Sequence, residues 1–321
     1  MADAVRPDLK QKWWINARDY AVYLIVRCVV CVLQSMSLSA CATMARNLAW
    51  LFTAVIPIRR RVLRENLRTA FPNWTDAEQD VCIRAMWEHL FLMLGEMTLS
   101  RRKLHRTNWR DHLRSVNIGQ MMALMWQPRP KVIVSAHYGN FELAAYVIGL
   151  FGFETYAVAR SLDNPYLDKF LNDFRAVHGQ HLIEKDGSAV EIALLLERHS
   201  TLILLGDQHA GQKGCWVDFF GKPASTHKSI GLFVLGNEAP LGVSYSRRIG
   251  GPLQYEIVFQ GELDPKLQTE RMDVTDVTRW FTHEFEEFIR RDPSQYWWLH
   301  RRWKGEPPVR KKKQTPQSLA S

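Results

Sequence analysis

The sequence has few cysteines, and their arrangement does not suit a chemical role. The five cysteines are odd in number and three of them lie in one apolar stretch, which does not fit a disulfide framework. Cys28 and Cys31 form a C-x-x-C pair, but outside any strand–helix–strand unit. Free cysteine usually behaves as a small apolar side chain, so we expect a reducing compartment and no redox role.

Motifs for nucleotide binding and for serine hydrolysis are also missing. No G-x-G-x-x-G follows a predicted strand, and the sequence contains neither a P-loop nor a G-x-S-x-G. His178 and His181 form an H-x-x-H without a third ligand at a recognisable spacing, which favours a surface pair. The sequence therefore predicts no metal and no cofactor, and it argues against an α/β-hydrolase lipase.

A long uninterrupted apolar run is absent as well. Residues 17–58 are the most apolar part of the chain, but charged side chains interrupt them at Arg18, Asp19, Arg27 and Arg46. A spanning helix needs about 20 mostly apolar residues. This segment thus predicts either a marginal span or helices that lie in the membrane interface. Its long, charged leader and the lack of a clear cleavage site argue against a signal peptide.

The chain is basic, with a formal net charge of +9, and this favours an anionic partner. Nucleic acid, anionic lipid headgroups and an acidic carrier protein would all satisfy the charge. Basic residues follow the apolar stretch directly, at Arg59, Arg60, Arg61, Arg64 and Arg68. Cations beside an apolar segment bind anionic leaflets and prefer the cytoplasmic side. Because no RNA- or DNA-binding motif accompanies them, we expect a membrane surface and no nucleic acid.

Beyond the apolar stretch the pattern alternates between strands and helices. A capping box at Thr75–Glu78 predicts a helix towards Leu99. Strands are predicted at 131–136, 155–159, 181–184, 201–205, 241–247 and 254–259, and further helices at 141–150, 165–177, 188–198, 225–235 and 277–289. This rhythm predicts an α/β domain with a central mixed, partly parallel sheet flanked by helices.

The expected organisation has three parts. Residues 1–70 form N-terminal membrane-associated helices, residues 71–305 form the α/β domain, and residues 306–321 form a basic polar tail that we expect to be disordered. In open α/β sheets the active site lies at the carboxyl ends of the strands. Three such ends carry polar residues, at 135–142, 159–160 and 206–209.

The first of these strand ends carries His137, with Glu142 five residues later. On a continuous helix these side chains would point about 140° apart. They can meet if His137 lies in the Gly139–Asn140 turn and Glu142 in the first helical turn. A carboxylate beside an imidazole fixes its tautomer, but a lone histidine at a strand end is structural more often than catalytic.

The segment SAHYGNFE, residues 135–142, resembles the motif of the glycerolipid acyltransferase superfamily: histidine, four residues, then Asp or Glu. Its Gly-Asn-Phe-Glu form is that of the bacterial lipid A biosynthesis (late) acyltransferase family, which includes the phosphatidylinositol mannoside acyltransferases. Further resemblances follow in the family's order over nearly the whole chain, at residues 60–72, Arg160 with Asn164-Pro165, 206–208, 217–223 and 295–304. A single clean membrane anchor, common in the family, is not matched here.

The resemblance implies an acyltransferase fold and an acyl transfer from acyl-ACP or acyl-CoA to a hydroxyl of a lipid, such as a lipid A precursor, at the cytoplasmic face of the inner membrane. It implies that His137 is the general base and that Glu142 orients it. Residues expected to bind substrate are Gly139, Asn140, Arg160, Asn164, Asp207 and Gln208.

Several roles stay open at this stage. Arg160 could donate to the oxyanion together with backbone N–H groups near Gly139 and Asn140, or clamp an acceptor phosphate, or form a structural ion pair. Asp207 could hold Arg160, His137 or a sugar hydroxyl, or could cap a helix. Another phospholipid or glycolipid acceptor, a lipid thioesterase with water as the acceptor, and a non-catalytic membrane-binding relative are the alternative functions.

Overall fold

The computed structural model describes residues 9–176, 179–184 and 189–308. The helices are α1 (Leu9–Ser35), α2 (Leu38–Trp50), α3 (Arg60–Ala70), α4 (Asp76–Lys103), α5 (Ile118–Met125), α6 (Phe141–Leu150), α7 (Pro165–Ala176), α8 (Ala189–Glu197), α9 (Ser229–Gly236) and α10 (Val274–Arg291). The strands are β1 (Leu113–Val116), β2 (Lys131–Ser135), β3 (Thr155–Ala159), β4 (Gln180–Glu184), β5 (Thr201–Leu205), β6 (Cys215–Phe219), β7 (Lys222–Thr226), β8 (Leu241–Arg248) and β9 (Tyr255–Leu263).

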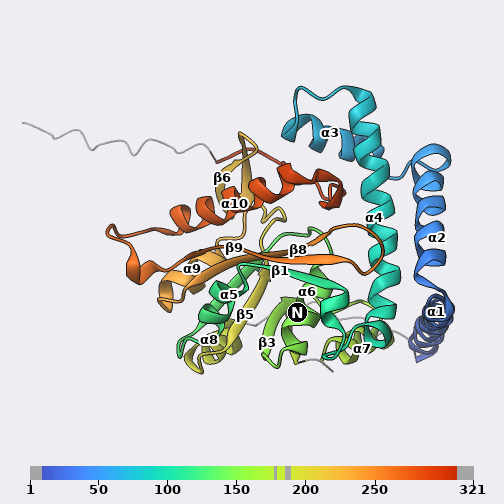
Figure 1. The fold of residues 1–321 in the computed structure, drawn as a ribbon, viewed down its shortest axis with the longest axis horizontal. Helices are drawn as coiled ribbons and strands as arrows, with labels where there is room; N and C mark the ends of the chain where they lie inside the picture. The colour runs from blue at the N-terminus through green and yellow to red at the C-terminus, as the bar shows by residue number, and fades with distance from the viewer. Residues whose placement is uncertain (1–8, 177–178, 185–188, 309–321) are drawn as a thin grey trace, which may run out of the picture.

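A seven-stranded mixed sheet forms the centre of the molecule, with strand order β1-β9-β8-β2-β5-β3-β4. Among the described strands of this sheet, β8 and β9 pair antiparallel and the other neighbours pair in parallel. Strands β6 and β7 form a separate antiparallel hairpin. Helix α10 lies on one side of the sheet, and α5 and α6 lie on the other (Figure 1). Helix α8 packs against Ile183 and Leu202, on the same side as α10. The predicted α/β fold with a mixed, partly parallel sheet flanked by helices is confirmed.

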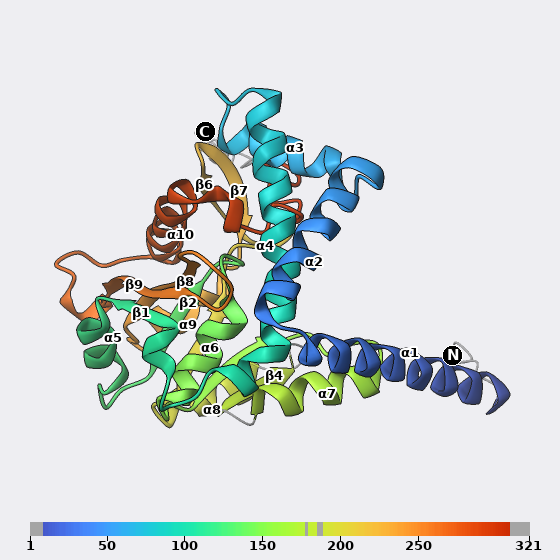
Figure 2. The same cartoon turned by 45° about the vertical axis from the view of Figure 1, so that its right-hand side comes forward.

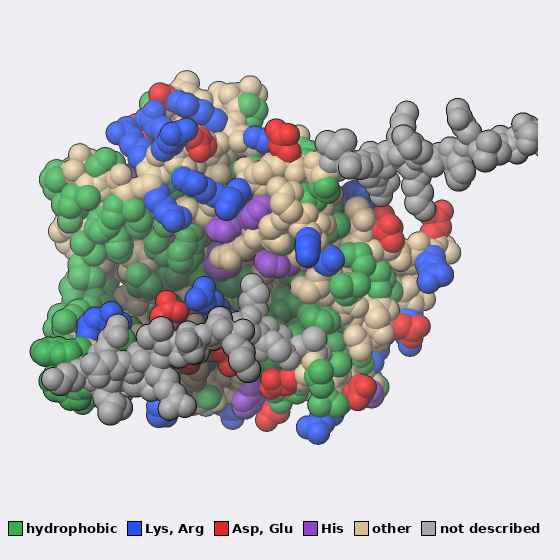
Figure 3. Space-filling model, turned by 180° about the vertical axis from the view of Figure 1, so that it is seen from behind, with side chains coloured by type: hydrophobic (Ala, Val, Ile, Leu, Met, Phe, Trp, Pro, Cys, Tyr) green, Lys and Arg blue, Asp and Glu red, His purple; other side chains and the backbone are tan. Residues whose placement is uncertain are grey.

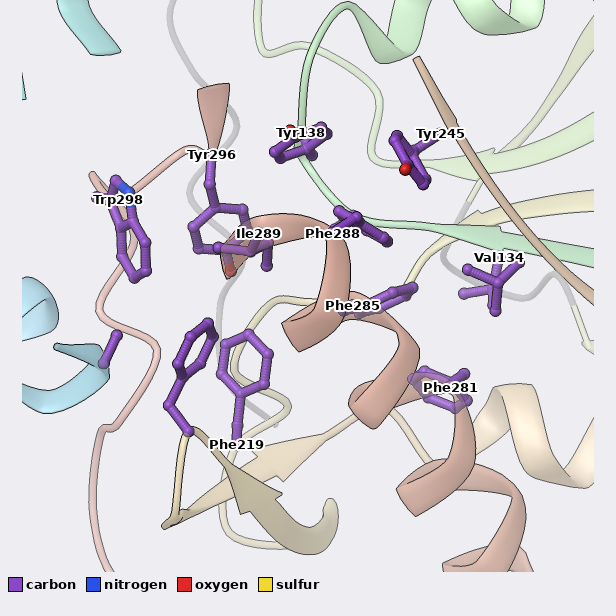
Figure 4. Packing of buried hydrophobic residues seen from close by; sticks show 14 of the residues in the cluster. Val134, Tyr138, Phe219, Tyr245, Phe281, Phe285, Phe288, Ile289, Tyr296 and Trp298 are labelled. Carbon is purple, nitrogen blue, oxygen red and sulfur yellow. The ribbon is translucent and has the colours of Figure 1, made fainter. Parts of the chain in front are cut away.

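The core between α10 and the sheet is aromatic. Phe281, Phe285 and Phe288 repeat along one face of α10 and are fully buried or nearly so. Figure 4 shows Phe288 beside Tyr138 and Tyr245, with ring centroids 4.9 and 4.3 Å away. Burying a large aromatic side chain contributes roughly 1.5–3 kcal/mol, so this face holds α10 firmly against the strands.

The N-terminal helices lie beside the sheet domain. Helix α2 runs along α4, and α1 projects outwards from the body past α7 (Figure 2). None of the described helices is long and apolar enough to cross a membrane by itself. The segments Leu38–Val55 and Arg60–Ala70 pass that test only together, and they are bent by 96° at the break between them.

Most predicted elements are present, and one prediction was partly wrong. The Thr75–Glu78 capping box starts α4, as expected. The helix predicted over 225–235 begins only at Ser229, because residues 222–226 pair as a strand with β6. The short strand β1 and helix α5 were not predicted. The first residue of the helix predicted over 188–198 and the tail from 309 lie outside the described residues.

Candidate active site

His137 lies two residues beyond the end of strand β2, in a tight turn before α6. The next side chain, Tyr138, is fully buried and packs on Tyr245 and Phe288, which anchors the turn in the core (Figure 4). Gly139 has φ +56° and lies so close to β8 that a Cβ there would be 1.7 Å from the carbonyl oxygen of Ser246. Only glycine fits this position, so the backbone conformation of the turn that carries His137 is tightly restricted.

The ring of His137 is hydrogen-bonded to Asp207. Strands β2 and β5 are parallel neighbours with Ser135 opposite Leu205, so the residues two positions beyond each strand also face each other. Nδ1 of His137 lies 2.8 Å from Oδ1 of Asp207, and the backbone N–H of His137 donates to Oδ2 at 3.1 Å. A carboxylate can only accept, so Nδ1 carries the proton and Nε2 is left as the basic nitrogen.

The electrostatics of this pair are coupled. Burial alone would lower the pKa of His137, but the charge and hydrogen bond of Asp207 and the charge of Glu142 outweigh it and leave that pKa raised above 6.5. Burial would raise the pKa of Asp207, but the His137 contacts and the charge of Arg302 keep it below 3.8. The pair thus holds an ionised carboxylate against an imidazole whose proton affinity is increased.

Glu142 does not make the contact that its spacing suggested. Its carboxylate is bound by the guanidinium of Arg175 on α7, with one Nε–Oε2 distance of 3.0 Å, and both side chains are largely buried. Helix α6 turns Glu142 towards α7, whereas Asp207 reaches Nδ1 from the neighbouring strand. The expected Glu142–His137 hydrogen bond is therefore replaced by the Asp207 contact, and Glu142 acts on the ring only through its charge.

Two of the expected substrate-binding side chains face solvent near this strand edge. Gln208 is exposed, and its amide nitrogen lies 3.3 Å from Nε2 of His137. Arg160 directly follows β3, a strand that is separated from β2 by β5 alone. Its side chain is 80% exposed. Its ion pair with Asp163 is 3.3 Å long and wholly on the surface, and such pairs contribute little stability.

Three others have structural roles that sequence reasoning had not separated from binding. The N–H of Gly139 already donates to the carbonyl of Gln295 at 2.9 Å, so it is not available to an oxyanion. Asn140 is fully buried, and its Oδ1 accepts from the N–H of Leu143 as the cap of α6. Asn164 caps α7 and donates to the carbonyl of Asp19 in α1. These groups of the three residues are therefore already engaged within the protein.

A small apolar cavity adjoins His137 between α4 and the C-terminal segment. It is lined by His137, Gly139, Phe141 and Trp297 and by methionine and leucine side chains at Met86, Leu90, Met93 and Leu299. The rings of Phe141 and Trp297 meet the imidazole edge-on, with centroids 5.1 and 5.6 Å away. Seen from behind, histidine side chains gather beside a hollow in the surface (Figure 3).

The C-terminal segment was the main omission of the sequence reasoning. The indole of Trp297 contacts the ring of His137, and the backbone N–H of Trp297 donates to the backbone carbonyl of His137 at 2.9 Å. Arg302 is only 2% exposed and influences Asp207 through its charge. Both lie in the stretch 295–304 that resembled a family signature, but nothing local in that stretch indicated which residues face the site.

Metal ligation has no candidate in the described part of the chain, where no three His, Cys, Asp or Glu side chains are grouped to hold an ion. His178 of the H-x-x-H pair lies outside the described residues, and His181 stacks on Tyr156 with ring centroids 5.1 Å apart.

The chain resembles known proteins over most of its length. The profile of the family described as bacterial lipid A biosynthesis acyltransferase matches residues 9–305. The chain belongs to this family. The lipid A biosynthesis acyltransferase of Haemophilus influenzae is 23% identical over 93% of both chains. The lipid A biosynthesis lauroyltransferase and palmitoleoyltransferase of Escherichia coli are 22% and 24% identical, over 78% of this chain and 80% of theirs.

As a member of this family the protein is an acyltransferase of lipid A biosynthesis. Among solved structures, a 1-acyl-sn-glycerophosphate acyltransferase from Thermotoga maritima aligns with 78% of this chain and 98% of its own. Its sequence identity is 11% and the TM-score is 0.38. The predicted family and enzyme class are thus confirmed, by the family profile and the curated relatives.

Proposed function

We propose that this acyltransferase moves a fatty acyl chain from the thioester of acyl-ACP or acyl-CoA to a hydroxyl of a lipid A precursor, with His137 as the general base. The observation that carries the proposal is the bond from Nδ1 of His137 to Asp207, which leaves Nε2 as a proton acceptor at the carboxyl edge of the sheet. General-base assistance of this kind contributes about 10²–10⁴-fold.

In the proposed reaction, Nε2 of His137 takes the proton of the acceptor hydroxyl as its oxygen attacks the thioester carbonyl carbon. Asp207 stays ionised and stabilises the imidazolium that forms. When the tetrahedral intermediate collapses, the carbon–sulfur bond breaks, the new ester remains on the lipid, and the imidazolium returns its proton to the departing thiolate. The products are the acylated lipid and a free thiol.

Gln208 occupies the position where the acceptor hydroxyl has to arrive. Its amide nitrogen lies within reach of Nε2, and it is exposed, so it can swing away when a substrate enters. We assign Arg160 to the acceptor, because its planar guanidinium is free of strong partners and suits a phosphate of the lipid headgroup. Glu142 contributes negative charge near the imidazolium and holds α6 to α7 through Arg175.

We also propose that the enzyme works on the cytoplasmic face of the inner membrane. Helix α1 exposes large apolar side chains over its length, including Trp13, Trp14, Ile25 and Val32, each at least 60% exposed. Apolar surface of this extent favours burial in a lipid interface. Acyl-ACP and acyl-CoA are both acidic, which suits a chain with a net charge of +9.

The test is acyl transfer by the purified full chain in detergent, with acyl-ACP and acyl-CoA offered separately and products identified by mass spectrometry. We expect acylated lipid A precursor, and a rate at least about 10²-fold lower for His137→Ala, the smallest loss for a removed general base. Free fatty acid as the only product would establish a thioesterase instead. A wild-type rate in folded His137→Ala would refute His137 as the base.

A further inference from the structure

The backbone of the turn that carries His137 is paired with the C-terminal segment. The N–H of Gly139 donates to the carbonyl of Gln295, and the N–H of Trp297 donates to the carbonyl of His137, both at 2.9 Å. Between these bonds, Tyr138 and Tyr296 form an antiparallel bridge. The segment 295–297 therefore pairs with the turn like a short strand and fixes the position of the turn relative to the sheet.

The side chain of Gln295 is bound in turn to the end of strand β8. Its Oε1 accepts from the backbone N–H of Arg248 at 2.8 Å, and its Nε2 donates to the carbonyl of the same residue at 3.0 Å. Nε2 also donates to Asp292 at 2.7 Å. The amide can satisfy all three partners in one orientation only, and the residue is just 6% exposed.

Arg248 is itself immobilised by a buried carboxylate. Glu96 of α4 is fully buried and binds the Arg248 guanidinium through both of its oxygens. The same carboxylate accepts from the hydroxyl of Tyr255 at 2.5 Å and from the N–H of Leu253 at 2.6 Å. Each polar partner is satisfied, which makes this a rigid anchor beneath the β8–β9 turn.

On its other side, the turn that carries His137 is packed tightly against strand β8. Gly139 lies directly against the carbonyl of Ser246, two residues before Arg248 on β8. A shift of the 295–297 segment relative to β8 therefore has to move the turn itself, and with it the imidazole. Because the His137–Asp207 bond joins two different strands, a small displacement changes its length and direction.

We infer that Gln295 is a positioning residue for the acyl transfer: its amide fixes the 295–297 segment to Arg248, and its carbonyl fixes Gly139, so that His137 stands at the correct place relative to Asp207. This inference rests on the proposed function of His137. It assigns to Gln295 a role in catalysis without contact with either substrate.

The matched comparison is between Gln295→Met and Gln79→Met. Gln79 is a buried glutamine, 2% exposed, that donates to the carbonyl of Trp74 near the start of α4. It lies seven residues before Met86, the first residue of α4 that lines the cavity, or about 10 Å along the helix. Each variant is purified as the full chain, its melting temperature is measured, and kcat and the pH profile of kcat/KM are determined per folded molecule.

We expect both variants to melt at lower temperature, and only Gln295→Met to lose kcat, by about 10- to 100-fold, since a shift of about 1 Å in a reacting group can cost about 10²-fold. KM should change little, because the side-chain amide of Gln295 is bound to the backbone of Arg248 and to Asp292. The acid limb of kcat/KM should also move to lower pH in Gln295→Met alone, as the Asp207 bond that raises the pKa of His137 is loosened.

Should Gln295→Met fail to fold, Gln295→Asn decides, because it keeps the amide but is one methylene too short to reach both backbone groups of Arg248. A wild-type kcat and acid limb in either folded Gln295 variant would overturn the inference. His137→Ala is assayed in parallel. If His137→Ala is inactive while the Gln295 variants are normal, only the inference fails; if His137→Ala is active, the proposed function fails first.

Discussion

Replacing Asp207 by asparagine tests the central pair most directly. Asp207 is 4% exposed and accepts two bonds from His137, one from the ring and one from the backbone N–H. Asparagine keeps the shape but has one acceptor oxygen and one NH₂ group. If the asparagine oxygen accepts from the backbone N–H of His137, the asparagine NH₂ group faces Nδ1. This favours the imidazole tautomer that carries its proton on Nε2, and in that tautomer Nε2 cannot act as a base.

The expected loss in kcat is between about 10²-fold, the lower value for a removed general base, and about 10⁴-fold, the loss when asparagine replaces the orienting carboxylate of a serine protease triad. The pH profile should change in a defined direction. Asp207 raises the pKa of His137, so its removal lowers that pKa, and the acid limb of kcat/KM moves to lower pH. Stability should fall by about 1–3 kcal/mol, the cost of a lost bond to a buried charge.

The assay is acyl transfer by the folded full chain from pH 5 to pH 9, with Glu142→Gln as the matched carboxylate-to-amide control. Glu142 is hydrogen-bonded to Arg175 and not to His137, so we expect its replacement to reduce kcat less and to move the acid limb less. A wild-type rate and acid limb in folded Asp207→Asn would refute the reasoning. A larger loss in Glu142→Gln than in Asp207→Asn would instead restore Glu142 as the orienting carboxylate.

Three further outcomes are expected. Deleting residues 1–58 should shift the protein from the membrane to the soluble fraction on fractionation, and unchanged partitioning would contradict the membrane role of α1 and α2. Gly139→Ala should abolish transfer and lower the melting temperature, because its Cβ would lie 1.7 Å from the Ser246 carbonyl; a normal melt would show that the turn can relax. Arg160→Lys should lose most activity with an unchanged melt, since lysine cannot offer a planar two-pronged contact, and normal turnover and acceptor affinity would argue against acceptor binding.

Local sequence signals were sufficient for much of the fold. Capping boxes, β-branched runs and the 3.6-residue repeat of phenylalanine in α10 predicted most elements, because each depends on residues that are neighbours in the chain. The hairpin of β6 and β7 was not predicted, and its second strand was assigned to a helix. Short strands at Val217 and Ala224 are stabilised by pairing with each other, which a single window of sequence does not contain.

The sequence by itself determined that His137 ends a strand, that a glycine follows it in a tight turn, and that the chain resembles a family of lipid acyltransferases. Only the tertiary structure decided which carboxylate meets the imidazole. Glu142 is five residues away and Asp207 is seventy, but β5 lies next to β2 in register, so the distant residue forms the bond. Local sequence patterns do not reveal strand order, because the order follows from how all the helices and strands pack together.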